Sequence, residues 1–375
     1  MSGVWSEQPC NVYGRTTYAC KRALKMDSLH SLGVSFIELL QHTFSNYENH
    51  MFFMSHMGDP RNAFLIYFPV VFCFSPNAGQ RVLWVAALAE WLNAILKWLL
   101  YGQRPYWWVH ETSIYGKDNV PDLHQFPLTC ETGPGSPSGH AMVTASVWFV
   151  MVTAFTSVSN KSKQPTAESN GFKSLLSWLL FTGVMVMVST SRLFIATHFP
   201  HQVLFGTVVG MILAYICNHA PLEDLKLHNY IIGSVCIIST SVVLYFTLQS
   251  LGFNPGWSVS LAMKWCIKSE YIHLDTTPFY ALSRDAGCVL GLGVILISVG
   301  SRFPDALRGK IDVMASLIAA LCCFIYCRAI EMISLPQENI LLFYTYGFLK
   351  NSLIPIGVVS LRCLVASLIC KQKNH

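Results

Sequence analysis

The turn Pro137-Ser-Gly-His140 leads directly into AMVTASVWFVMVTAFTSVS, residues 141–159, which contain no charged side chain. From Gly139 on, this run has about the 20 residues that an α-helix needs to cross the hydrocarbon core of a bilayer. The whole chain has the same character, since 53% of its 375 residues are hydrophobic and only 12% are charged. Such a chain is too apolar for an ordinary soluble domain. The sequence therefore predicts an all-α, polytopic membrane protein.

We expect about nine transmembrane helices. The first is the least regular, because its apolar run, residues 62–74, is shorter than a spanning helix needs. In the fifth, Gly206 and Gly210 have the spacing that allows close helix packing. Before the first span, apolar residues at helical spacing between positions 28 and 45 predict an amphipathic helix on the membrane surface. The other predicted spans include or are centred on residues 81–101, 139–159, 174–189, 201–217, 229–250, 289–299, 312–326 and 340–370.

We interpret residues 1–25 as an N-terminal extension and residues 26–375 as a single integral-membrane domain. The loops after the first, third, fifth and seventh spans carry most of the loop lysines and arginines, so the positive-inside rule places them in the cytoplasm. The opposite side then receives two long loops, residues 102–138 and 251–286. The net charge of +5 is scattered along the chain, which gives no basic stripe for a nucleic acid.

Most of the 13 cysteines, for example Cys236 and Cys323, lie within apolar runs and are interpreted as small buried hydrophobic residues. Four cysteines lie outside the spans and could pair if their side of the membrane is oxidising; which of them pair stays open. They are Cys10, Cys20, Cys130 and Cys266. The sequence has no Cys-x-x-Cys pair and no zinc-ligand spacing.

A first polar cluster lies at the end of the second span. Glu90, Asn93 and Lys97 share one helical face, and ionisable groups at membrane depth normally face partner helices or a wet cavity. Arg104 follows Lys97 by two helical turns, so we expect both to point the same way from a helix that Pro105 ends. Together they could bind a phosphoryl group. Snorkelling at the membrane interface is the alternative.

A second cluster is the loop ETGPGSPSGH, residues 131–140. Its glycines and prolines predict a tight turn directly before a helix, where backbone N–H groups and the helix dipole can bind an anion. Ser138 adds a hydroxyl donor. His140 stands in the first turn of the helix, where its imidazole could exchange a proton with the same anion. The alternative is a simple turn with a capping serine and an incidental histidine.

A third cluster follows the fourth span. Arg192, after Ser191, supplies another guanidinium. His198 is a candidate nucleophile, because a neutral imidazole attacks phosphorus well and the resulting phosphohistidine is labile to water. His201 competes for that role on composition alone. If the membrane folds the ends of these spans together, the three clusters form one phosphate site.

The combined pattern Lys97-x6-Arg104-Pro105, Pro137-Ser-Gly-His140 and Ser191-Arg192-x5-His198 resembles the tripartite signature of the type 2 phosphatidic acid phosphatase superfamily. The expected fold is therefore the helical core of that superfamily. The longer runs at residues 130–140 and 198–203 resemble the glucose-6-phosphatase catalytic subunits, and the likeness extends from about Met26 to near the C-terminus. Within that family, segments such as Leu282-Ser-Arg-Asp285 look closest to the ubiquitously expressed third catalytic subunit.

The resemblance implies hydrolysis of glucose 6-phosphate, or a related sugar phosphate, to the sugar and inorganic phosphate. His198 would be the nucleophile and His140 the proton donor, and neither a cofactor nor a metal ion is expected. The superfamily usually has an aspartate four residues after the nucleophile, where this chain has Gln202, so the group that holds His198 stays open. The residues expected to bind the phosphate are Lys97, Arg104, Ser138, Gly139 and Arg192.

Lys371 and Lys373 resemble a dilysine retrieval signal, which implies the endoplasmic reticulum membrane, with a lumenal active site and a cytoplasmic C-terminus. The substrate would then have to cross that membrane, and the resemblance implies functional coupling to a glucose-6-phosphate translocase. One alternative is a lipid phosphate phosphatase on the same scaffold. Another is an anion transporter whose pathway is lined by the face that contains Glu90. The two long loops favour a water-facing pocket and a soluble substrate.

Overall fold

The computed structural model describes residues 18–116, 118–161, 167–272, 278–302, 304, 307, 309, 311–334 and 339–373. Within these residues every regular element is a helix. Eight of the described helices are long and apolar enough to cross a membrane. The prediction of an all-α, multi-pass membrane protein is therefore confirmed.

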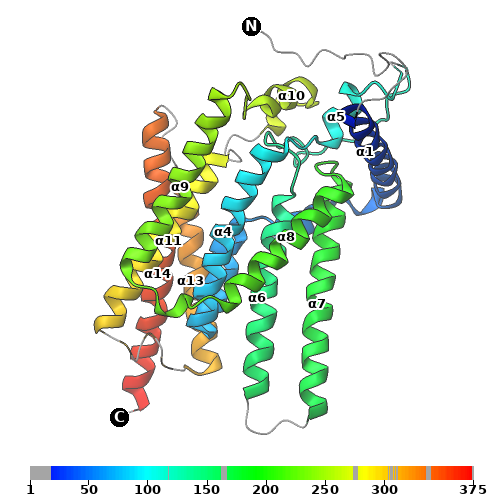
Figure 1. The fold of residues 1–375 in the computed structure, drawn as a ribbon. Coiled ribbons are helices and arrows are strands. Elements are labelled where there is room, and N and C mark those ends of the chain that lie inside the picture. The colour runs from blue at the N-terminus through cyan, green and yellow to red at the C-terminus, as the bar shows by residue number, and fades with distance from the viewer. Residues whose placement is uncertain are drawn as a thin grey trace.

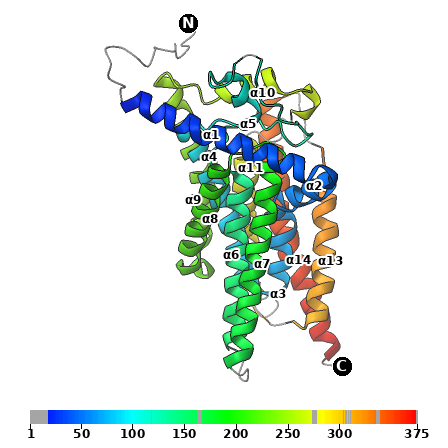
Figure 2. The same ribbon diagram turned by 90° about the vertical axis from the view of Figure 1, so that its right-hand side faces the viewer.

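The eight long helices form an upright bundle (Figures 1 and 2). Most of their ends agree with the predicted spans to within several residues, because the length of an apolar run is a local property that survives folding. The exception is α11, which begins at Pro278 and so includes the last residues of the segment 251–286 that the sequence assigned to a loop. The helices are α4 (Pro76–Leu100), α6 (Gly139–Lys161), α7 (Ala167–Phe194), α8 (Pro200–His219), α9 (Leu227–Ser250), α11 (Pro278–Arg302), α13 (Val313–Glu331) and α14 (Ile340–Lys373).

The first predicted span is a shorter apolar helix, Ala63–Phe74. It consists of a π-helical turn, Ala63–Tyr67, that continues into α3, Phe68–Phe74. The preceding helix α2, Glu48–Met57, is a separate element and does not extend it. With this shorter helix, the described residues contain nine apolar helical segments, of which eight are long enough to span a membrane.

One end of the bundle is covered by α1 (Tyr18–Thr43), α5 (Pro105–Glu111) and α10 (Trp257–Trp265). Helix α1 lies across the bundle at that end (Figure 2). It buries Val34 and Ile37 but leaves Leu32 71% exposed, so it presents apolar side chains on two faces. The helix predicted for residues 28–45 is confirmed, although it begins earlier. Its place on a membrane surface and the division of the chain at residue 25 stay predictions.

The short helix α5 carries three consecutive aromatic residues, Tyr106, Trp107 and Trp108, of the types that are enriched at membrane interfaces. All three side chains are buried. They belong to a hydrophobic cluster to which α1 and α10 also contribute. These side chains therefore pack inside the protein and do not face lipid, because two segments far away in the sequence cover α5.

A disulfide joins the two long loops at the covered end. It links Cys130 to Cys266, whose Cα atoms lie 5.8 Å apart although 136 residues separate them in the sequence. This answers the open pairing for Cys130 and Cys266, while Cys10 lies outside the described residues. Cys323 is buried as predicted, whereas Cys236 is exposed on α9. By closing a long ring of chain, the disulfide reduces the freedom of the unfolded state.

Helix α8 packs directly against α6 through its two spaced glycines. A Cβ atom at Gly206 would lie 2.6 Å from the Ser138 carbonyl oxygen, and one at Gly210 would lie 2.3 Å from the Met142 carbonyl oxygen. Both distances are too short for a real Cβ contact. The missing side chains therefore let α8 touch the backbone of α6 where that helix begins.

We expect Gly210→Ala to lower the free energy of unfolding by about 1–3 kcal/mol, because the added methyl group must push α8 away from α6. Thermal unfolding of the purified protein in detergent measures this change. Gly183→Ala on α7 is the matched control, since a Cβ there meets no atom within 4 Å. Equal melting temperatures for the two variants would contradict the close packing described here.

Candidate active site

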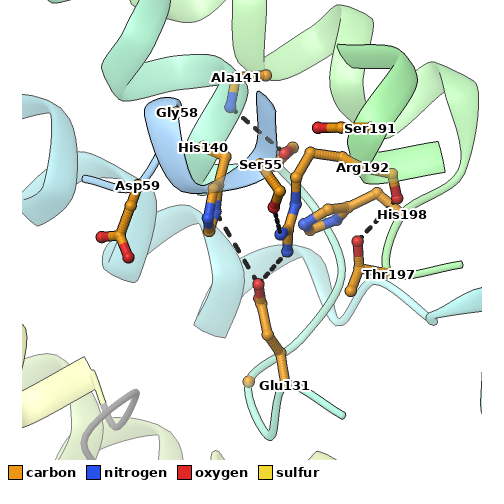
Figure 3. A network of polar contacts seen from close by, with 12 residues as sticks. Ser55, Gly58, Asp59, Glu131, His140, Ala141, Ser191, Arg192, Thr197 and His198 are labelled. Atoms are coloured by element: carbon orange, nitrogen blue, oxygen red, sulfur yellow. Dashed lines mark hydrogen bonds and ion pairs between the residues drawn. The ribbon is translucent and has the colours of Figure 1, made fainter. Parts of the chain in front are cut away.

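The structure brings the three polar clusters together at the end of the bundle that α1 covers. Lys97 lies in the last turn of α4 and Arg192 in the last turn of α7. His140 is the second residue of α6, and His198 lies between α7 and α8. In Figure 3, the side chains of His140 and Arg192 point toward the carboxylate of Glu131, and His198 lies next to Arg192. Helix ends thus supply most of the site.

Glu131 is the centre of this arrangement, although the sequence assigned it no role. Its Oε2 accepts a hydrogen bond of 2.9 Å from Arg104, and its Oε1 accepts one from Arg192. The same Oε1 lies 3.9 Å from Nδ1 of His140. The carboxylate therefore occupies the position between two guanidiniums that a bound phosphate would need.

The charge of Glu131 follows from these neighbours. Burial alone would raise the pKa of its carboxyl, but the positive charges of Arg104, Arg192 and Lys97 outweigh burial and hold the pKa well below its usual value. The group is therefore ionised and neutralises part of the positive charge of the site. An anionic substrate must compete with it for the same donors.

The backbone between Lys97 and Arg104 does not form the continuous helix that the sequence predicted. Helix α4 ends at Leu100, and Tyr101 has the left-handed φ of 50°. Arg104 itself is extended, with φ −114° and ψ 149°, directly before α5. A single helix from Lys97 to Arg104 is therefore wrong. Pro105 does exclude helical geometry at Arg104, but the chain has already left the helix earlier.

The guanidinium of Arg104 is completely buried and is held by backbone carbonyls as well as by Glu131. It donates 2.7 Å to Gly133, 3.2 Å to Pro134 and 3.1 Å to Thr197. The first two carbonyls belong to the loop before α6. The third belongs to the turn after α7. Arg104 therefore joins the second and third sequence clusters.

The loop before α6 can lie so close to Arg104 because of Gly135. A Cβ there would lie 2.3 Å from the Gln103 carbonyl oxygen. At the end of the loop, the N–H of Ser138 donates 3.1 Å to the Gln202 carbonyl, so that N–H is already used. The N–H of Gly139 begins the helix, where N–H groups have no intrahelical acceptor, and it can serve an anion.

His198 is completely buried, and its two ring nitrogens have different surroundings. Nδ1 lies 2.8 Å from the carbonyl oxygen of Gly135; because a carbonyl only accepts, Nδ1 carries the proton. Nε2 has no hydrogen-bond partner among the described residues. Burial, together with the positive charge of Arg104, holds the pKa of His198 well below its usual value. The ring is thus neutral, as a nucleophile requires.

The group that the sequence left open is therefore the Gly135 carbonyl, and not Gln202. The Gln202 side chain donates 2.7 Å to the Gln103 carbonyl and accepts 3.1 Å from the Phe199 N–H at the start of α8. It orders the backbone around the site instead of touching the imidazole. The contact between His198 and the Gly135 carbonyl joins segments far apart in the sequence, so no local sequence pattern could predict it.

His201 lies in a different environment from His198. Its ring stacks against His30 of α1, with centroids 5.4 Å apart, and against Phe199. It lines a separate cavity beneath α1. The two candidate nucleophiles are therefore distinguished by position, and only His198 lies beside the two guanidiniums.

A cavity of about 150 Å³ adjoins the site and is lined by Lys97, His140 and Glu131. Glu90 and Asn93 line it as well, which confirms that these two residues and Lys97 share one face of the helix. The sequence missed the other charged residues of its wall. The sequence did contain a signal for them, because each is an ionisable residue next to or inside an apolar run, and such residues normally face a partner or a wet cavity. They are Asp59, Arg61 and Arg284.

The described part of the chain contains no group of three or more His, Cys, Asp or Glu side chains arranged to hold a metal ion. That the site needs no metal and no cofactor stays a prediction.

Comparison with known proteins gives consistent matches over most of the chain. The sequence model of the PAP2 superfamily matches residues 79–225, which contain all three clusters. The chain is 41% identical to "Glucose-6-phosphatase 2" of Homo sapiens, over 93% of this chain and 99% of the relative. It is 38% identical to "Glucose-6-phosphatase catalytic subunit 1" of Canis lupus familiaris, over 90% of this chain and 94% of the relative.

The third member of that group is among the relatives, as the sequence suggested. "Glucose-6-phosphatase 3" of Mus musculus is 37% identical, over 90% of this chain and 94% of the relative. Because this identity is close to the other two, the values do not single out one branch. No solved structure gives a significant match.

Replacing Glu131 with Gln would leave two buried guanidiniums without their shared carboxylate. We expect Glu131→Gln to lower the free energy of unfolding by about 3–5 kcal/mol in phosphate-free detergent. Added inorganic phosphate or orthovanadate should raise the melting temperature of this variant more than that of the wild type, because the anion takes the place of the carboxylate.

Glu223→Gln is the control for this experiment. Glu223 pairs with Arg81 through contacts of 2.8 and 2.9 Å, and it lies at the opposite end of the bundle, between α8 and α9. Added phosphate should raise the melting temperature of Glu223→Gln by the same amount as that of the wild type. If phosphate stabilises Glu131→Gln no more than the wild type, Glu131 does not compete with a bound anion.

Proposed function

This chain belongs to the glucose-6-phosphatase family, and we propose that it hydrolyses glucose 6-phosphate to glucose and inorganic phosphate. The observation that carries the proposal is the state of His198. Its neutral ring presents a free Nε2 beside Arg104 and Arg192, with His140 across the site (Figure 3). A phosphoric monoester hydrolase that uses a histidine nucleophile needs these groups together.

In the proposed mechanism, Lys97, Arg104 and Arg192 bind the phosphate, together with the N–H of Gly139 and the hydroxyl of Ser138. The phosphate replaces Glu131 as the acceptor of hydrogen bonds from both guanidiniums. The positive side chains then stabilise the charge on the equatorial oxygens in the transition state. Paired N–H donors on each guanidinium suit a phosphoryl group in geometry as well as in charge.

The chemical steps follow from the positions of the two histidines. Nε2 of His198 attacks phosphorus, the bond from phosphorus to the sugar oxygen breaks, and His140 gives its proton to that oxygen. This leaves a phosphohistidine at His198. Water then attacks phosphorus while His140 accepts the proton of that water, and the bond from nitrogen to phosphorus breaks to release inorganic phosphate.

The two ends of the bundle support an endoplasmic reticulum location with a lumenal site. The disulfide Cys130–Cys266 lies at the end that carries the site, and disulfides persist in oxidising compartments such as that lumen. Helix α14 ends at the opposite end of the bundle (Figure 1). The C-terminal Lys371 and Lys373, which resemble a retrieval signal, would then be cytoplasmic.

A lumenal site requires that substrate cross the membrane first. We therefore include functional coupling to a glucose-6-phosphate translocase in the proposal. The reaction would serve gluconeogenesis and glucose homeostasis, or the clearance of sugar phosphates, with glucose 6-phosphate or a related sugar phosphate as the substrate.

We expect His198→Ala to lower the rate of phosphate release from glucose 6-phosphate by at least about 1000-fold, because the nucleophile itself is lost. Phosphoenzyme trapping with labelled substrate should give no signal for this variant. His201→Ala is the control and should keep both phosphate release and the phosphoenzyme. The reverse pattern would refute the choice of nucleophile.

The same purified protein distinguishes the two other functions that the sequence allowed. Release of phosphate from phosphatidic acid in mixed micelles, without release from glucose 6-phosphate, would indicate a lipid phosphatase. Anion flux in liposomes without any phosphate release would indicate a transporter.

The proposed orientation predicts different protease access to the two ends of the bundle. In sealed microsomes, an epitope after His375 should be removed by added protease, because the C-terminus faces outwards. An epitope in the exposed loop at Asn119 should survive until detergent opens the vesicles. Protection of the C-terminal epitope instead would overturn the orientation.

A further inference from the structure

The cavity beside His140 has a wall of paired charges. We call it the leaving-group pocket. In Figure 3, Asp59 lies on one side of His140, and Arg192 and His198 lie on the other. Its volume of about 150 Å³ is enough for roughly five water molecules. The charged and amide side chains of the wall are Asp59, Arg61, Glu90, Asn93 and Arg284.

Two ion pairs hold the carboxylates of this wall. Arg284 of α11 donates to Glu90 of α4 and, at 2.9 Å, to Oδ1 of its neighbour Asp285. Arg61 donates to both oxygens of Asp59, at 2.6 to 3.1 Å. Each carboxylate has about four acceptor sites, so each can accept further hydrogen bonds. The side chains of Glu90 and Asp59 are 10% and 17% exposed, and both line the cavity.

Asp59 keeps its negative charge inside this wall. Burial would raise the pKa of its carboxyl, but hydrogen bonds and charge from Arg61 lower the pKa to about 2. The pocket therefore offers a permanent hydrogen-bond acceptor. An apolar occupant would leave the remaining acceptor sites of Asp59 and Glu90, those that Arg61 and Arg284 do not fill, without donors, at an energetic cost.

The position of the pocket identifies which part of the substrate can enter it. The group that leaves phosphorus must lie within reach of His140, because His140 gives it a proton in the proposed mechanism. The pocket adjoins His140 directly, together with Lys97 and Glu131. A leaving group rich in hydroxyl groups fits this wall, since hydroxyl groups donate to carboxylates.

Resting on the proposed function, we infer that the leaving-group pocket holds the sugar of the substrate, and that Glu90 and Asp59 accept hydrogen bonds from its hydroxyl groups. Arg284 and Arg61 act as positioning residues that fix the two carboxylates. The phosphate-binding clusters recognise only the phosphoryl group. The leaving-group pocket therefore supplies the selectivity for a sugar phosphate over other phosphate esters.

The test compares two substrates in the purified protein. Glucose 6-phosphate carries the hydroxyl groups, and p-nitrophenyl phosphate lacks them. We expect Glu90→Gln to lower kcat/KM for glucose 6-phosphate by about 10- to 100-fold, mainly through KM, because a carboxylate acceptor is lost. The kcat/KM for p-nitrophenyl phosphate should change less than about threefold.

Arg61→Ala provides a second variant that does not threaten the bundle, because the Arg61 side chain is 48% exposed. It should raise KM for glucose 6-phosphate selectively, since Asp59 loses the group that holds it. Glu223→Gln makes the same chemical change as Glu90→Gln at the far end of the bundle. It should leave both substrates unaffected.

Equal losses on the two substrates in both pocket variants, or no loss on either substrate, would overturn the sugar pocket while leaving the proposed function intact. If Glu90→Gln does not fold, Arg61→Ala alone decides between these outcomes. A wild-type protein that hydrolyses p-nitrophenyl phosphate but not glucose 6-phosphate would instead overturn the proposed function. The two failures are therefore distinguishable.

Discussion

The ion pairs of Glu131 with Arg104 and Arg192 are the interaction on which the rest of the structure depends. Two completely or almost completely buried guanidiniums would repel each other, and buried unpaired charges are costly. One carboxylate between them offsets both charges. Because Arg104 directly precedes α5 and Arg192 lies in the last turn of α7, the same contact also joins these two helices. In the proposed mechanism a phosphate replaces the carboxylate, so the substrate would use the same donors that Glu131 pairs with in this structure.

The loop that carries Glu131 organises the site with its backbone as well. Carbonyls of Gly133 and Pro134 accept from Arg104, and the carbonyl of Gly135 fixes the tautomer of His198. The loop is in turn held in place by its disulfide to the 251–286 loop and by the glycines of α8. Small residues matter here because they let backbones approach closely. The chemistry of the site therefore depends on the positions of backbone carbonyls, which a sequence motif does not specify.

Charges elsewhere in the bundle follow the same rule of pairing. Glu90 on α4 meets Arg284 on α11, so two ionisable residues within apolar helices satisfy each other across the helix interface. Burying an ionisable group in a membrane costs free energy unless the group pairs with an opposite charge or reaches water. Glu90 and Arg284 pair with each other and also line the cavity. The packing of α4 against α11 thus makes the pocket beside His140 polar. The ends of α4 and α6 determine where the pocket lies.

The sequence by itself determined the class of fold, the number of apolar helices and the residues of the three clusters, because run length, helical spacing and motif order are local properties of the chain. It also identified the family. The tertiary structure alone decided that Glu131 is central, that Gly135 and not Gln202 holds His198, that Tyr106 to Trp108 are buried, and that Cys130 pairs with Cys266. Each of these depends on a contact between segments far apart in the sequence, and no periodicity or spacing specifies which distant segments meet.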